Sequence, residues 1–243
     1  MHRFANPTRF MKLATMLTPW AAWSTVILLG SGLYFALFAS PADYQQGETV
    51  RMMYVHVPAA WMGMFCYVAV AVASAVGLIW KHPLADLAAK ATSPVGAAFT
   101  FLALLTGSLW GKPMWGTWWV WDARLTSMLI LLFLYLGHMA LINAFDDQTR
   151  GMRSASILAL VGVINIPIIK FSVDWWNTLH QPASVVKMDG PAIHPDMLIP
   201  LLLMALGYKT FYIWVALLRI RREVIATKIR AIRLRQVVSA NGA

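Results

Sequence analysis

Residues 125–145 read LTSMLILLFLYLGHMALINAF and contain no Asp, Glu, Lys or Arg. A run of this kind is long enough to cross the ~30 Å hydrocarbon layer of a membrane, which takes ~20 apolar residues in a helix. Because lipid offers the backbone no hydrogen-bond partner, the segment must be helical. This one stretch therefore predicts an integral membrane protein.

Five further stretches have the same character, so the sequence predicts an all-α integral membrane protein with six transmembrane helices. The fifth span is short unless it continues through Lys170 to Val173, and the sixth contains Lys209. A charge within a span is by default a functional hint, but for Lys209 we favour a side chain that reaches the nearby end of its span or a partner helix. The expected spans are residues 20–39, 57–80, 91–111, 125–145, 154–173 and 197–218.

The composition of the whole chain agrees with this class. Of 243 residues, 59% are hydrophobic and 12% are charged, whereas soluble domains carry about 25% charged residues. A soluble enzyme is thereby excluded. The single cysteine, Cys66, excludes an intramolecular disulfide, a CxxC redox pair and a thiolate zinc site. The longest connection, residues 170–196, is too short for a folded soluble domain, so we expect one membrane domain over residues 1–243.

The positive charges predict the orientation of the spans. Between them, the two termini and the second and fourth connections hold 14 Lys and Arg residues, whereas the other three connections hold five. Because Lys and Arg concentrate on the cytoplasmic side, we expect both termini to be cytoplasmic. The net charge of +10 then marks a membrane face and does not indicate nucleic acid binding. The basic tail, residues 219–243, is expected to lie along anionic lipid headgroups.

The third connection is unusually rich in tryptophan. Residues 110–124 read WGKPMWGTWWVWDAR, and five of these residues are Trp. An aromatic belt would place Trp at both membrane interfaces, which does not account for so dense a cluster in one loop. The indoles suit a large planar aromatic ligand at the outer face. We expect Pro113 to keep the segment from becoming helical, so that the loop begins at residue 110.

Two polar residues close this loop. Asp122 is well placed to cap the N-terminus of the fourth span, and we favour that role over ligand contact. Arg124 follows at the membrane surface. Its guanidinium either binds a carboxylate of a ligand or marks the interface.

Two histidines are expected on the same outer face as the loop. His56 precedes the second span and His180 lies in the fifth connection. Together they fit axial ligation of haem iron, although His194 is on the same side and leaves the pairing open. His138 lies within the fourth span, where a structural role is expected. The two haem propionates would find cationic partners in Arg51, Lys112 and Arg124.

Residues 115–124, WGTWWVWDAR, resemble the tryptophan-rich signature of the haem-handling protein family. HVP at residues 56–58 and WWNTLH at residues 175–180 resemble the flanking motifs of its short members from bacterial cytochrome c maturation. The resemblance covers nearly the whole chain. It implies that His56 and His180 ligate a transiently bound haem b, with a haem-contacting set that also contains Arg51, Trp115, Trp118, Trp119, Trp121, Asp122 and Arg124.

The resemblance also implies a place for the protein in the cell. It predicts a multi-pass protein of the bacterial inner membrane that holds haem at the periplasmic face and delivers it to a membrane-anchored haem chaperone. A small single-span helper protein and the membrane and ATPase subunits of an ABC transporter are the other implied partners. No enzyme activity of its own is expected. The alternatives are a haem-transporting permease subunit of an ABC exporter and, less favoured, a cytochrome b electron-transfer subunit.

Overall fold

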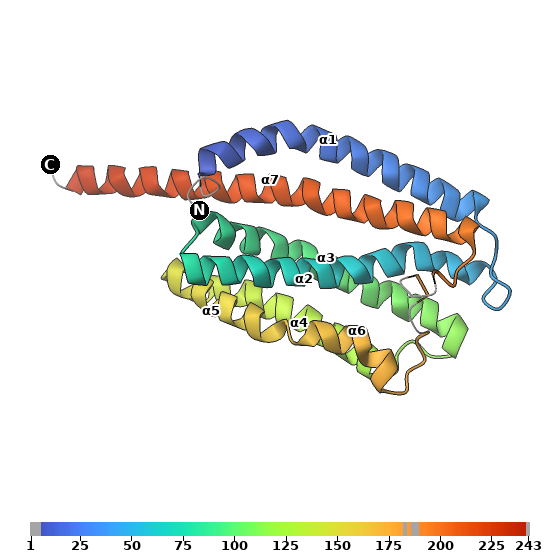
Figure 1. Ribbon diagram of the computed structural model, residues 1–243. Coiled ribbons are helices and arrows are strands. Elements are labelled where there is room, and N and C mark those ends of the chain that lie inside the picture. Colours follow the sequence, from blue (N-terminus) through green and yellow to red (C-terminus); the bar gives the residue numbers. More distant parts are fainter. Residues whose placement is uncertain (1–5, 182–183, 186–189, 242–243) are drawn as a thin grey trace.

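The computed structural model describes residues 6–181, 184–185 and 190–241, and these residues form an elongated bundle of helices (Figure 1). Short π-helical and 3-10 segments, Phe35–Ala39 and Glu48–Met52, follow α1 and precede α2. The α-helices are α1 (Pro7–Tyr34), α2 (Met53–Trp80), α3 (Pro83–Trp115), α4 (Ala123–Asn143), α5 (Gln148–Gly162), α6 (Asn165–Trp175) and α7 (Pro195–Asn241).

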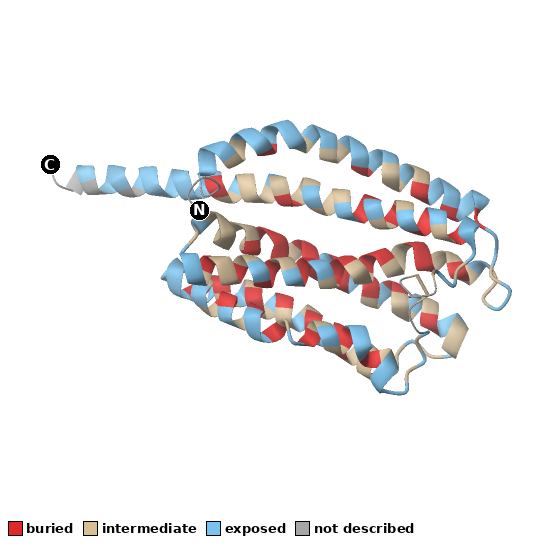
Figure 2. Cartoon of the chain, viewed as in Figure 1, coloured by how far each residue is buried: buried red, intermediate tan, exposed pale blue. Residues whose placement is uncertain are grey.

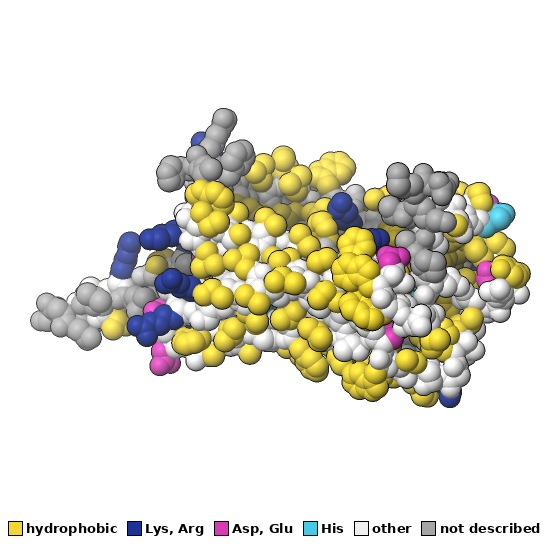
Figure 3. Space-filling view, turned by 60° about the horizontal axis from the view of Figure 1, so that its bottom comes forward, with side chains coloured by type: hydrophobic (Ala, Val, Ile, Leu, Met, Phe, Trp, Pro, Cys, Tyr) yellow, Lys and Arg dark blue, Asp and Glu magenta, His cyan; other side chains and the backbone are white. Residues whose placement is uncertain are grey.

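The predicted fold class is confirmed. Within the described residues, six helical segments are long and apolar enough to cross a membrane. The fifth segment consists of α5 and α6 together, and it continues through Lys170 as far as Trp175. Figure 3 shows hydrophobic side chains covering the length of the bundle, while Lys and Arg gather near the end where α7 finishes.

The bundle has two distinct ends. We call the end at which α2, α4 and α7 begin and α3 and α6 finish the site end, and the opposite one the tail end. Helix α1 begins and α7 finishes at the tail end (Figure 1). The cytoplasmic location of this end stays a prediction, and Arg3 and Lys187, which entered the charge count, lie outside the described residues.

The basic tail continues the last span as part of one helix. Helix α7 is a single helix of 47 residues, which at 1.5 Å per residue is ~70 Å long, more than twice the hydrocarbon thickness. Its last turns project beyond the other helices along the same axis (Figure 1). No Gly or Pro occurs between Gly207 and Asn241, which agrees with an uninterrupted helix. The contact of the tail with anionic headgroups stays a prediction.

The Trp-rich loop is shorter than predicted, because α3 continues through Pro113 to Trp115. A proline near the end of a helix removes only one ladder hydrogen bond, so Pro113 does not prevent the final turn. The helix stops at Gly116, whose φ of 76° is easily adopted only by glycine, and whose N–H donates to the Lys112 carbonyl at 3.1 Å. The non-helical loop is therefore residues 116–122.

Helices α2 and α3 form the centre of the bundle. Figure 2 shows that buried residues concentrate on these two helices, with α1 and α7 along one side and α4, α5 and α6 along the other. The two central helices approach closely at Gly63, where a Cβ would lie 2.7 Å from Thr100 Oγ1 and 3.4 Å from Thr100 Cα. The Tyr135 hydroxyl of α4 donates to the Gly63 carbonyl at 2.7 Å. Gly63 thus brings three helices together.

We expect Gly63→Val to destabilise the purified protein by ~1–3 kcal/mol, because the added atoms have no space between α2 and α3. Gly30→Val is the matched control, since a Cβ at Gly30 meets nothing within 4 Å. Thermal unfolding in detergent should show a lower midpoint for the first variant alone. Equal midpoints would contradict this account of the packing.

Candidate functional site

A cavity of about 370 Å³ lies at the site end, where α2, α4 and α7 begin and α3 and α6 finish. Most of its lining is apolar. The charged, histidine and tryptophan side chains of the lining are His56, Trp61, Trp110, Trp115, Arg124, Lys170, Asp174 and His180.

His56 is held in place by α3. It lies in the first turn of α2, and its Nδ1 is 2.9 Å from the Ala103 carbonyl oxygen and 3.2 Å from Thr106 Oγ1. A carbonyl oxygen only accepts hydrogen bonds, so Nδ1 carries the proton and Nε2 of the neutral ring keeps its lone pair. A Cβ at Gly107 would lie 2.7 Å from His56 Cε1, and the lack of one lets the ring lie against α3.

His180 is held by the loop after α6 and by the start of α4. Its Nδ1 lies 3.2 Å from Thr178 Oγ1 and 3.4 Å from Asp122 Oδ2. The Thr178 hydroxyl donates its own proton to Asp122, so it accepts from His180. Nδ1 is again the protonated nitrogen, and the lone pair is on Nε2.

The two imidazoles therefore present the same atom. Within the described residues, neither His56 nor His180 makes a hydrogen bond through Nε2, and both rings line one cavity. No group of three or more His, Cys, Asp or Glu residues suited to a metal ion occurs in the described part of the chain. The donor set fits a metal that arrives with its own equatorial ligands, such as the iron of a porphyrin, and that takes two axial nitrogens.

The protonation of His180 follows from its surroundings. Burial lowers the pKa of His180 below its ordinary value, the Asp122 carboxylate opposes this shift, and the Arg124 guanidinium adds to it. The net effect is a lowered pKa, so the ring is neutral at neutral pH. Only the neutral ring can ligate a metal through Nε2.

The predicted capping role of Asp122 is confirmed. Its Oδ1 accepts the Leu125 N–H at 2.7 Å and caps α4. Its Oδ2 faces Thr178 and His180, which the sequence did not indicate. Asp122 thus joins the start of α4 to the loop that carries His180.

The cationic residues are divided between the cavity and the surface. Arg124 lines the cavity and donates to Ser172 Oγ at 3.1 Å and to the Ile169 and Lys170 carbonyls at 3.3 Å. Arg51 instead bonds to Glu48 and the Ala36 carbonyl, and Lys112 bonds to the Gly116 carbonyl. Neither of these two lines the cavity, whereas Lys170, which sequence reasoning did not select, does.

The indoles do not form one continuous floor. Trp115 packs edge-on against His180, with ring centroids 4.9 Å apart, and Trp110 does the same to His56 at 5.7 Å. Trp118 and Trp121 are 53% and 75% exposed and do not line the cavity. Trp119 packs against Trp121. Two indoles of residues 110–124, Trp110 and Trp115, therefore line the cavity, whereas Trp118, Trp119 and Trp121 do not. The number of Trp residues in the sequence does not indicate this division.

His138 and His194, the two further histidines considered from the sequence, do not line the cavity. The exposed His194 side chain faces Asp196, with Nδ1 3.7 Å from Oδ2. His138 is buried in α4. Neither is among the residues that line the cavity.

A protein-family model described as "Heme exporter protein C" matches residues 1–235. The chain belongs to the heme exporter protein C family. Three similar relatives carry that name. The protein of Bradyrhizobium diazoefficiens is 57% identical over 96% of this chain and 88% of its own length. The Haemophilus influenzae protein is 51% identical over 93% of this chain and 92% of its own length. The Escherichia coli K12 protein is 48% identical over 93% of this chain and 91% of its own length. The family resemblance that the motifs indicated is confirmed.

We expect Asp122→Asn to lower the pKa of His180 further, because the carboxylate that favours the imidazolium is lost, while α4 stays capped since Asn caps as well as Asp. Histidine-selective NMR titration measures the first effect and thermal unfolding the second. Asp147→Asn is the control, because Asp147 also caps a helix, α5, through its side chain but lies at the tail end. An unchanged His180 titration would show that Asp122 is only a cap.

Proposed function

We propose that this protein holds haem in the cavity at the site end, with His56 and His180 as axial ligands, and delivers it to a haem chaperone for the biogenesis of c-type cytochromes. The observation that carries the proposal is the pair of Nε2 atoms, each kept free by an acceptor at Nδ1 and each belonging to a ring that lines one cavity. Family membership supports it, since the relatives are named for heme export.

The remaining lining fits haem b. Its apolar side chains suit the porphyrin face, and Trp110 and Trp115 add aromatic surface beside the two histidines. Arg124 and Lys170 supply two positive charges for the propionates, against one negative charge from Asp174 in the same lining. Haem, when bound, contributes the iron that the two imidazoles recognise, and the protein itself performs no redox or hydrolytic step.

The two ligands are supported differently, which suits a cargo that must leave. His56 is fixed between two helices of the bundle core. His180 lies in the connection after α6 and depends on Thr178 and Asp122 for its orientation. Residues in loops move more readily than residues in packed helices. Release of haem therefore begins at His180.

Delivery requires a surface beside the cavity. Trp118 and Trp121 are exposed on the short loop between α3 and α4, next to the cavity-lining Trp115. Tryptophan is enriched among the residues that dominate binding energies at protein interfaces. We propose that this loop docks the membrane-anchored chaperone, with the site end in the periplasm of a bacterial inner membrane. A single-span helper and the subunits of an ABC transporter complete the proposed complex.

We expect the purified protein to show the absorption spectrum of low-spin, six-coordinate haem b. His56→Ala and His180→Ala should each lose haem or give a five-coordinate spectrum, because one axial nitrogen is removed, and added imidazole should partly restore the parent spectrum. His194→Ala, which removes a histidine at the same end but outside the cavity, is the control. Parent-like spectra of both cavity variants would overturn the ligand assignment.

The docking role of the outer indoles needs a separate variant. Replacing Trp118 and Trp121 together by Ala should leave the haem spectrum unchanged and weaken the haem-dependent complex with the chaperone at least tenfold, as loss of central interface residues does. Trp80→Ala is a matched control, since Trp80 is also 53% exposed but lies at the tail end. Undiminished co-purification of chaperone and haem would reduce the loop to a membrane anchor.

A further inference from the structure

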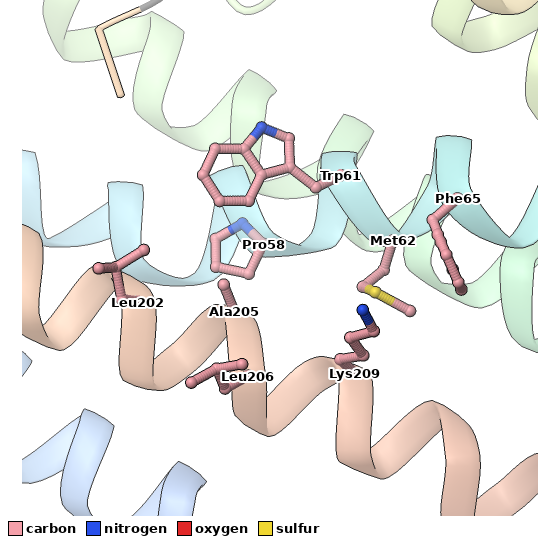
Figure 4. A pocket seen from close by; sticks show the side chains of 8 residues that line it. All are labelled: Pro58, Trp61, Met62, Phe65, Leu202, Ala205, Leu206 and Lys209. Carbon is pink, nitrogen blue, oxygen red and sulfur yellow. The ribbon is translucent and has the colours of Figure 1, made fainter. Parts of the chain in front are cut away.

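A second hollow, of about 440 Å³, lies between α2 and α7. We call it the side groove (Figure 4). All but one of its lining side chains are apolar. The lining consists of Pro58, Trp61, Met62, Phe65, Leu202, Ala205, Leu206 and Lys209.

The side groove opens toward lipid. Both of its helices belong to segments that can cross a membrane, and Phe65, Leu202 and Leu206 on its rim are exposed. Lys209 lies 14 residues after the start of α7 at Pro195, which places it ~21 Å along the helix and within the depth of the hydrocarbon layer.

Lys209 has no anionic partner within the described residues. Its one described contact is with the ring of Phe65, whose centroid lies 5.5 Å from Nζ. Figure 4 shows the side chain reaching from α7 toward α2, which agrees with the expectation of a partner helix. A charged side chain at membrane depth is costly unless it meets an opposite charge. Lys209 therefore offers a positive charge to an anionic group that enters the groove.

The side groove adjoins the cavity. Trp61 lines both hollows, and on α7 the cavity-lining Leu201 is followed directly by the groove-lining Leu202. On α2, His56 lies five residues before Trp61. Trp61 is the residue shared by the two linings, so a ligand that moved from the lipid side toward the two histidines would have to displace its indole.

The occupant that matches these features is an apolar molecule that carries a negatively charged group such as a carboxylate. A lipid tail would not need the ammonium group of Lys209, and a partner helix would not need the continuity with the cavity. We infer that haem reaches its site laterally from the lipid through the side groove, with Lys209 binding a propionate and Trp61 separating the groove from the cavity. This inference rests on the proposed function and adds the route by which haem arrives.

The test uses the full-length, haem-free protein in lipid vesicles, to which ferric haem is added. The rate at which the low-spin spectrum forms reports loading. Lys209→Met should slow loading roughly tenfold, the factor that ~1.4 kcal/mol of lost attraction produces, and should reach the same final spectrum. Lys209→Arg keeps the charge and should load at the parent rate. Equal rates for the Met variant and the parent would remove Lys209 from the route.

A second variant tests the groove without touching the lysine. Leu206→Cys, labelled with a bulky maleimide, should block loading, whereas labelled Phe133→Cys on α4, which is also exposed and apolar but outside the groove, should not. Cys66 is buried and is common to both proteins. Equal loading of the two labelled proteins would overturn the lateral route.

Two further outcomes separate the possibilities. If the labelled Leu206→Cys protein loads at the parent rate but no longer co-purifies with a membrane partner, the groove binds a helix and the lateral route is wrong. If the unlabelled parent forms no low-spin spectrum at all, the proposed function itself fails, and the lateral route fails with it.

Discussion

The close approach of α2 and α3 is the constraint on which the site depends. Where α3 faces α2, Gly63 and Gly107 have no side chain to hold the two helices apart. The Ala103 carbonyl and the Thr106 hydroxyl consequently reach the ring of His56. A wider spacing would leave Nδ1 without its acceptor, and the ring would be free to choose the other tautomer or to turn away. The close packing of α2 on α3 thus keeps the proton of His56 on Nδ1 and leaves the lone pair on Nε2.

The opposite wall of the cavity is fixed by polar contacts instead of close packing. Asp122 ends the Trp-rich loop, begins α4 and contacts Thr178, while Arg124 joins α4 to the last turns of α6. These contacts orient the loop that carries His180. The result is a site with one ligand held by the core and the other held by a hydrogen-bonded loop, which is a suitable arrangement for a group that is bound and then passed on.

The spans and the cap of α4 could be predicted from the sequence, because each depends only on residues that are neighbours along the chain. Hydropathy identifies the spans, and an Asp before an apolar run identifies a cap, as at Asp122. Which side chains face the cavity could not be predicted in this way, because it depends on the direction each residue takes around its helix and on the residue at which the helix ends. Trp115 lines the cavity and Trp118 does not, because α3 ends only at Trp115. The prediction that Pro113 ends the helix was wrong, so the sequence did not distinguish these two residues. Lys170 lines the cavity, but in the sequence it appears only as a charged residue near the end of a span.

The length of α7 has a mechanical consequence. One uninterrupted helix lines the cavity with Leu201, carries Lys209 in the side groove and ends far beyond the bundle. Because no Gly or Pro interrupts its second half, the helix is one continuous element that links the cavity, the side groove and the protruding turns. A change in the direction of the protruding turns would therefore be continuous, along a single helix, with the turns that line the cavity at the other end of the bundle.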